Sequence, residues 1–187
     1  MERLVLVTFA TRYGSTAVTT QAVAHTLRES GLAVELRAIN EVASVEPYCA
    51  VVLGVALYVG RLHKDARRFL NARREALTTI RVALFVPGPI ERREKDWSGA
   101  RQQLEKELAR SPWLTPAAGQ VVGGAFDSRK LGFPWKIIPA LRKIPVSDAR
   151  DWAAIRVWAN DLAGALQAGQ PTPTNARGQD APSSTEG

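Results

Sequence analysis

The chain has 187 residues, of which 45% are hydrophobic, and this size and composition suit one globular domain. Its 25 Lys and Arg residues outnumber its 18 Asp and Glu residues, which gives a formal net charge of +7. A single cysteine excludes an internal disulfide, the two histidines lack partners at metal-ligand spacing, and no stretch reaches the roughly 20 apolar residues of a membrane span.

The first predicted strand, residues 3–9, leads into a loop rich in hydroxyl groups. The strand is short and aliphatic, as is typical of a parallel strand buried on both faces. The loop Thr11-Arg12-Tyr13-Gly14-Ser15-Thr16 offers three hydroxyls and a flexible glycine, and the helix predicted over 15–30 presents unpaired N–H groups. These features suit one phosphate group, although helix capping alone also explains the hydroxyls.

The spacing of this loop disfavours two common nucleotides. It lacks the Gly-x-x-x-x-Gly-Lys-Ser/Thr order that holds the phosphates of a triphosphate. Its one glycine cannot form the Gly-x-Gly-x-x-Gly turn of a dinucleotide site. ATP and NAD are therefore weaker candidates than a ligand with a single phosphate.

The rest of the chain alternates predicted strands and helices. Four more strands are expected, at 32–38 on a sheet edge, at 49–55 in the centre, at 81–86 and at 120–126. Helices are expected after residue 63, after Asp96 as a capping residue, and over 148–167, with Asp148 as the cap and Trp152 facing inward. This alternation predicts an α/β fold with a doubly wound five-stranded parallel sheet.

Two further loops are expected beside the hydroxyl-rich loop. In an open parallel sheet, ligands bind beyond the carboxyl ends of the strands, near the switch point of the topology. The loop over 56–63 contains Ala56, Leu57, Tyr58 and Gly60, and the ring of Tyr58 could pack beside a flat ligand or be a half-buried hydrophobe. Pro87 and Gly88 end the fourth strand, and Gly88 has no side chain to obstruct a planar ligand.

Positive charge is concentrated between residues 61 and 74 and again between 129 and 143. Solvated helix faces, an anionic substrate, an anionic membrane surface and nucleic acid all remain explanations. No recognised nucleic-acid motif accompanies these residues, so nucleic acid is the least favoured partner.

The segment over 127–147 is longer than a doubly wound fold needs before its last helix. Within it, 131–144 interleaves apolar and basic residues, which suits either peripheral contact with an anionic membrane or docking on the domain. Because the N-terminus lacks the long apolar core of a signal peptide, we expect a cytoplasmic protein, with peripheral contact at the inner face of the membrane as an option. The domain is expected to span 1–167, and the Gly-, Pro- and Ser-rich residues 168–187 are predicted to form a disordered tail.

Three motifs resemble the flavodoxin-like FMN-binding family, and within it the menaquinone-dependent protoporphyrinogen IX dehydrogenase branch. They are the phosphate loop 11–16, the run Val51-Val52-Leu53-Gly54 followed by Gly60-x-x-His63 and Phe69, and the basic aromatic insertion before Asp151-Trp152. The resemblance covers residues 3–167 and implies the strand order 2-1-3-4-5. It also implies FMN on the phosphate loop, flavin contacts from loops 56–61 and 87–92, and oxidation of a porphyrinogen with a quinone as electron acceptor.

Arg61 and His63 are the candidate catalytic residues of such an enzyme. Arg61, with Arg92, Arg93 and Arg129, could meet the carboxylates of an acidic substrate, and His63 could move a proton, although a surface role at a helix start also fits it. Two other classes stay open. One is an electron-transfer or regulatory FMN protein with an acidic redox partner and no porphyrinogen activity. The other is a flavin-free binding module in which the loop only caps a helix.

Overall fold

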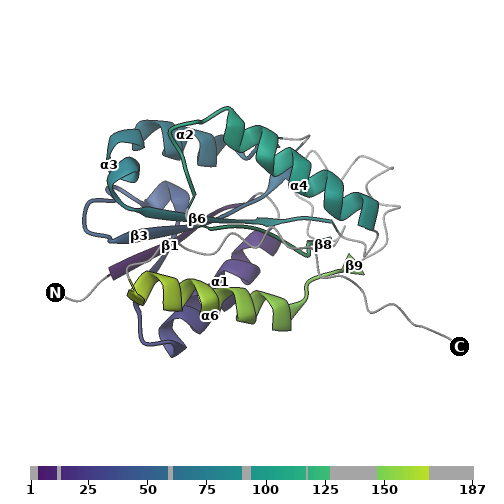
Figure 1. Ribbon diagram of the computed structural model, residues 1–187, viewed down its shortest axis with the longest axis horizontal. Helices are drawn as coiled ribbons and strands as arrows, with labels where there is room; N and C mark the ends of the chain where they lie inside the picture. The colour runs from purple at the N-terminus through teal and green to yellow at the C-terminus, as the bar shows by residue number, and fades with distance from the viewer. Residues whose placement is uncertain are drawn as a thin grey trace, which may run out of the picture.

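The computed structural model describes residues 4–11, 14–58, 61–89, 94–116, 118–126 and 147–168 (Figure 1). Several predicted features lie outside these residues: Arg12, Tyr13 and Gly60 of the expected cofactor site, Arg92, Arg93 and Arg129, the insertion over 127–146 with its candidate membrane segment, and the tail over 169–187. Those features stay predictions.

A five-stranded parallel sheet forms the centre of the molecule. Its strands lie in the order β2-β1-β3-β6-β7, which is 2-1-3-4-5 when these five strands are counted along the chain, as expected. Their bounds are β1 Leu4–Ala10, β2 Ala33–Ala38, β3 Ala50–Val55, β6 Arg81–Pro87 and β7 Ala118–Val122. The strand β2 lies on one edge, and a 3-10 turn, η1 (Ile39–Glu41), follows it.

Helices cover both faces of the sheet. Figure 1 shows α1 (Ser15–Glu29) and α6 (Trp152–Ala168) on one face, and α2 (Lys64–Ala72), α3 (Arg74–Thr79) and α4 (Glu94–Ala109) on the other. Because successive strand residues point to opposite faces, Val5 and Val7 pack toward α1 and α6, whereas Leu6 packs toward the other layer. The rings of Phe85 and Trp158 meet edge to face, with centroids 5.7 Å apart.

The switch point of the topology lies between β1 and β3. These strands are direct neighbours, yet α1 follows β1 on one face and α2 follows β3 on the other. Ala10 and Val55, the last residues of the two strands, pair in register. Thr11 and Ala56 therefore leave the sheet side by side, at the place where doubly wound folds bind ligands.

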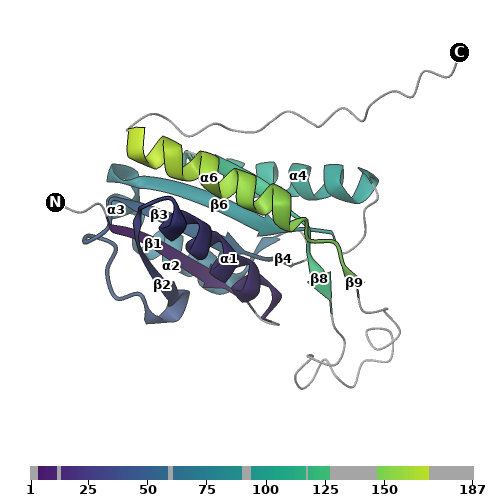
Figure 2. The same cartoon turned by 90° about the horizontal axis from the view of Figure 1, so that it is seen from below.

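The fifth predicted strand, 120–126, is wrong at its end. The sheet strand β7 stops at Val122, and residues Ala125–Phe126 form β8, which pairs antiparallel with β9 (Ser147–Asp148) beyond the end of the sheet (Figure 2). A Cβ atom on Gly123 would lie 1.9 Å from the carbonyl oxygen of Ala149, and one on Gly124 would lie 2.2 Å from that of Gly88. The glycine pair lets the backbone leave the sheet through this narrow passage.

The predicted start of the last helix is also wrong, because the helix begins at Trp152. Asp148 lies in β9, where its carboxylate accepts a 2.8 Å hydrogen bond from Nε of Arg150, so it does not cap the helix. Asp151 takes that role, because its Oδ1 accepts the N–H of Ala154 at 3.0 Å. Trp152 is 42% exposed rather than inward-facing, and the Arg150 guanidinium lies 4.6 Å from the centre of its ring.

Two other helix predictions need correction. The helix α4 begins at Glu94, so Asp96 lies in its first turn rather than at the cap. The helix expected after residue 63 is divided into α2 and α3 at Arg73, whose guanidinium donates to the carbonyl groups of Val42 and Ala43. No helix among the described residues is both long and apolar enough to cross a membrane.

Candidate functional site

The loop after β1 turns into α1 through Gly14. Its φ of +82° lies in the left-handed region, which favours glycine. The backbone N–H of Gly14 donates to Oγ1 of Thr11 at 3.0 Å, which fixes the shape of the turn. Among the described residues, no side chain caps the start of α1, and its first turn contains no acidic residue. Its N–H groups and partial positive charge are therefore suited to an anion.

The hydroxyl of Thr16, in the first turn of α1, is the most informative atom of this loop. Thr16 is 1% exposed, and its Oγ1 has no hydrogen-bond partner among the described residues. One turn later, Oγ1 of the fully buried Thr20 donates to the carbonyl of Thr16 at 2.7 Å, so it is satisfied. A buried hydroxyl without a partner is costly, and at a helix start its natural partner is a bound anion.

Thr8, within β1, is also buried, and its hydroxyl likewise has no partner in the part of the chain that the structure describes. The absence of a partner is therefore not specific by itself. At Thr16 it coincides with the uncapped start of α1 and with the switch point of the sheet, and these three features together fit the phosphate of a nucleotide.

The loop after β3 forms a short hairpin of β4 (Leu57–Tyr58) and β5 (Arg61–Leu62). Ala56 and Leu57 are partly buried, and the carbonyl of Ala56 accepts the N–H of His63 at 3.1 Å. The structure thus brings Ala56, as predicted, beside the phosphate loop, and it ties the far end of the hairpin back to the same residue.

His63 caps α2. Its Nδ1 accepts the backbone N–H of Asp65 at 3.3 Å and lies 3.5 Å from the Asp65 carboxylate. The side chain is only 11% exposed. The structure therefore gives this histidine a structural role, whatever else it does.

Arg61 is held against α4 by Glu107, a residue that sequence reasoning missed. The Glu107 carboxylate, 3% exposed, accepts the N–H of Leu62 at 3.0 Å, pairs with Arg110 and lies 3.6 Å from Nε of Arg61. Burial raises the pKa of Glu107, but the hydrogen bonds from Leu62 and Arg110 and the charges of Arg110 and Arg61 outweigh it, so the pKa stays below its ordinary value. The available signal was a charged residue three positions after Leu104 on the inward face of α4.

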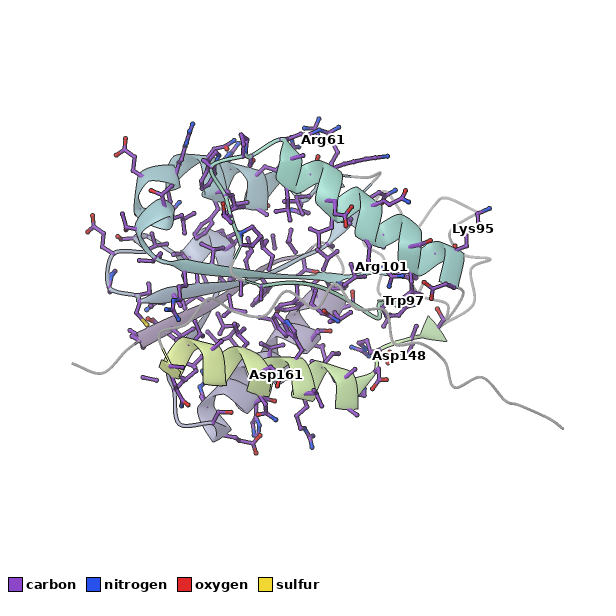
Figure 3. The ribbon with its side chains drawn as sticks, viewed as in Figure 1. Arg61, Lys95, Trp97, Arg101, Asp148 and Asp161 are labelled. Carbon is purple, nitrogen blue, oxygen red and sulfur yellow. The ribbon has the colours of Figure 1, made fainter. Side chains whose placement is uncertain are left out.

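Figure 3 shows where Arg61 lies relative to α4. It is beside the C-terminal half of the helix, whereas Lys95 and Trp97 lie at the opposite end with Asp148, beyond the carboxyl ends of the strands. Both predicted catalytic residues thus have partners within the fold. Arg61 pairs with Glu107 of α4, and His63 contacts Asp65 of α2.

Close packing explains why residue 88 is a glycine, independently of any ligand. A Cβ atom there would lie 2.6 Å from Cγ1 of Val121, and its N–H donates to the carbonyl of Val122 at 2.6 Å. Pro87 is the last residue of β6 and pairs with Val122. These two residues lie at the same end of the sheet as the phosphate loop. Within the described ranges, no group of three or more His, Cys, Asp or Glu residues could hold a metal ion.

A doubly wound sheet in which no described side chain caps the helix start at the switch point is the arrangement in which α/β proteins bind nucleotide phosphates. The sequence profile of the flavodoxin domain matches residues 6–144, so the chain belongs to the flavodoxin-domain family. Membership implies a flavin, usually FMN, and a general redox role. Comparison with curated proteins finds no significant match.

Solved structures agree on the fold. The flavodiiron core of Flv1 from Synechocystis sp. PCC6803 aligns at 16% identity with a TM-score of 0.58, over 90% of this chain and 37% of that one. Rubredoxin oxygen:oxidoreductase from Desulfovibrio gigas aligns at 16% identity with a TM-score of 0.54, over 89% of this chain and 37% of its own. This chain thus spans little more than a third of those two proteins. A flavodoxin from Streptococcus pneumoniae aligns at 15% identity with a TM-score of 0.54, over 89% of this chain and 99% of its own.

Proposed function

We propose that the chain is an FMN-dependent oxidoreductase that holds the terminal phosphate of FMN at the start of α1. The single observation that carries the proposal is the buried hydroxyl of Thr16, which has no partner among the described residues and lies at a helix start that none of their side chains caps. A phosphate there would accept hydrogen bonds from this hydroxyl, from Ser15 and from the first N–H groups of α1. The helix start supplies positive charge, so no metal ion is needed.

The flavin ring would lie between two loops. One loop, with Ala56, Leu57 and Tyr58, follows β3 beside the phosphate loop. The other begins at Pro87 and Gly88, where β6 ends at the same end of the sheet. When bound, FMN supplies the electron-transfer chemistry, while the protein binds and orients the cofactor. The phosphate loop fixes one end of the cofactor, and the two loops limit the access of water to the other.

For the substrate, we propose a porphyrinogen, with a quinone as the electron acceptor. The support is the resemblance of the run around Leu53 and Gly54, of His63 and of the basic insertion to the protoporphyrinogen dehydrogenase branch. Arginine side chains suit the carboxylates of such a substrate.

The experiment mixes the FMN-loaded protein with protoporphyrinogen IX and a menaquinone analogue in the absence of oxygen, and follows the fluorescence of the porphyrin product. Turnover that requires the quinone and is lost in a Ser15→Ala, Thr16→Val double variant is the expected result. Protein that binds FMN but gives no turnover contradicts the substrate proposal and leaves the cofactor proposal intact.

A catalytic role for His63 can be separated from its capping role. Asn is also a good N-cap, so His63→Asn should keep the stability of α2, whereas His63→Ala should lose about 1 kcal/mol. If His63 moves a proton in the reaction, both variants lose turnover, and the limb of the pH profile that depends on this histidine is present in the wild type and absent from both variants. Full turnover in His63→Asn would confine the residue to capping.

An electron-transfer protein is the second candidate function. The observation that favours it is the series of cations on the hairpin, α2 and α3, namely Arg61, Lys64, Arg67, Arg68, Arg73 and Arg74, which suits an acidic redox partner. Reduced FMN-loaded protein would then pass electrons to an acidic acceptor protein at a rate that falls steeply with added salt. A rate that is independent of salt contradicts this assignment.

A further inference from the structure

A cavity lies between the β4–β5 hairpin, α2 and the C-terminal end of α4. Its volume is about 160 Å³, and the described residues that line it include none of the phosphate loop. The lining contains three arginines and one glutamate, which gives a net charge of +2: Arg61, Arg67, Arg110 and Glu107. The cavity is therefore a concentrated positive site that the proposed cofactor does not use.

Glu107 holds two of the three cations in place and offsets one of the three positive charges. Its buried carboxylate binds the hairpin through the N–H of Leu62, at 3.0 Å, and pairs with Arg110 and Arg61. Arg67 is positioned separately, because its Nε donates to the carbonyl of Leu62 at 3.2 Å. A guanidinium has four further N–H donors beyond Nε, so these groups retain capacity for an acceptor in the cavity.

The helix end at this site does not oppose an anion as strongly as a bare helix C-terminus would. The carbonyls of Glu107 and Leu108 accept the N–H groups of Arg110 and Ser111, at 3.2 Å and 2.9 Å. Ser111 also lines the cavity and adds a hydroxyl, while Leu70 contributes an apolar wall.

The size of the cavity limits its occupant. About 160 Å³ is less than the 300–1,000 Å³ typical of pockets for drug-sized ligands, and is roughly five times the 30 Å³ of one water molecule. Guanidinium groups recognise phosphate and carboxylate through paired hydrogen bonds. We infer that this cavity binds a small oxyanion, of the phosphate or short carboxylate class, at a site distinct from the cofactor loop.

Such an oxyanion would bridge three elements of the fold. Arg61 belongs to β5, Arg67 to α2 and Arg110 follows α4. An occupant that contacts all three stabilises the folded state over the unfolded state, so its binding should raise the temperature of unfolding. The inference does not depend on FMN binding, since neither the cavity nor its lining involves the phosphate loop.

Inorganic phosphate is the first probe, titrated into the full chain in chloride buffer at constant ionic strength, with calorimetry and thermal unfolding as readouts. The same titration in the Ser15→Ala, Thr16→Val double variant removes binding at the cofactor loop. We expect the double variant to retain one phosphate site. A parallel titration with acetate distinguishes carboxylate from phosphate as the preferred ligand class.

Arg67→Gln is the decisive substitution because Arg67 does not pair with Glu107. Loss of its charged hydrogen bonds should raise the Kd for the probe about tenfold or more. Arg67→Lys keeps the charge but loses the paired N–H donors of the guanidinium, so its Kd should lie between those of the wild type and Arg67→Gln. The control Arg156→Gln, at an exposed position of α6, should bind the probe as the wild type does. Equal binding by Arg67→Gln and the wild type, or loss of all binding in the double variant, would overturn the inference.

Discussion

Thr16 is the residue on which the cofactor proposal depends. Its buried hydroxyl has no partner among the described residues, and a phosphate bound at the start of α1 would supply one. Thr16→Val replaces the hydroxyl by a methyl group of similar size. We expect the variant without FMN to be as stable as the wild type or up to about 1 kcal/mol more stable in urea unfolding, and its Kd for FMN to rise about tenfold or more.

Thr20→Val is the matched control for that substitution. It lies one turn further along α1, is equally buried, and donates its hydroxyl to the Thr16 carbonyl. Removal of the Thr20 hydroxyl should lower the free energy of unfolding by about 1 kcal/mol and leave the affinity for FMN unchanged. A Thr16→Val protein that loses stability and keeps its FMN affinity would assign this hydroxyl to the fold alone.

At the scale of elements, Glu107 joins the β4–β5 hairpin to α4. Because the pKa of Glu107 is lowered in the folded state, its contribution to stability is full above the ordinary glutamate pKa and is lost as the pH falls through the folded-state value. Glu107→Gln should therefore be about 1–3 kcal/mol less stable than the wild type at neutral pH. Urea unfolding over a pH series should show this difference shrinking in acid.

The control for Glu107 is Glu105→Gln, two residues earlier on the same helix and exposed. It should change stability by no more than about 0.5 kcal/mol at any of these pH values. A gap between wild type and Glu107→Gln that stays constant down to acid pH would show that the charge of Glu107 does not stabilise the hairpin.

The passage between β7 and β8 gives a second prediction for an element. Gly124→Ala would place its Cβ 2.2 Å from a backbone oxygen of Gly88, which cannot move aside without shifting the end of β6. We expect a loss of about 1–3 kcal/mol or more in urea unfolding. Gly164→Ala in α6, where no described atom lies within 4 Å of the new Cβ, should instead gain up to about 1 kcal/mol.

The comparison of sequence and structure shows which elements local pattern could predict. The five strands of the sheet and the helices on its two faces follow from aliphatic runs and helical spacing, and the phosphate loop follows from its hydroxyls and Gly14. The end of β7 could not be predicted, because the glycine pair avoids Ala149 and Gly88, which are distant in sequence. Glu107 was missed for a similar reason, since its partners lie on a hairpin that only the tertiary fold brings near.

For the molecule as a whole, the order of the strands and the sides on which their helices lie determine where the proposed cofactor site is. Neighbouring strands β1 and β3 are followed by helices on opposite faces, and doubly wound folds bind ligands beyond the carboxyl ends of two such strands. A ligand at this site would bind the folded state of the protein and not the unfolded state. FMN at a free concentration 100 times its Kd should therefore raise the free energy of unfolding by about 2.7 kcal/mol.

Whether the start of α1 holds FMN is tested by titrating the purified protein with FMN, following visible absorption, and comparing it with the Ser15→Ala, Thr16→Val double variant. We expect saturable binding of one FMN by the wild type, with a shifted flavin spectrum, and a large loss of affinity in the double variant. No binding by the wild type would contradict this expectation, leaving a flavodoxin-domain fold in which the hydroxyl-rich loop merely begins a helix.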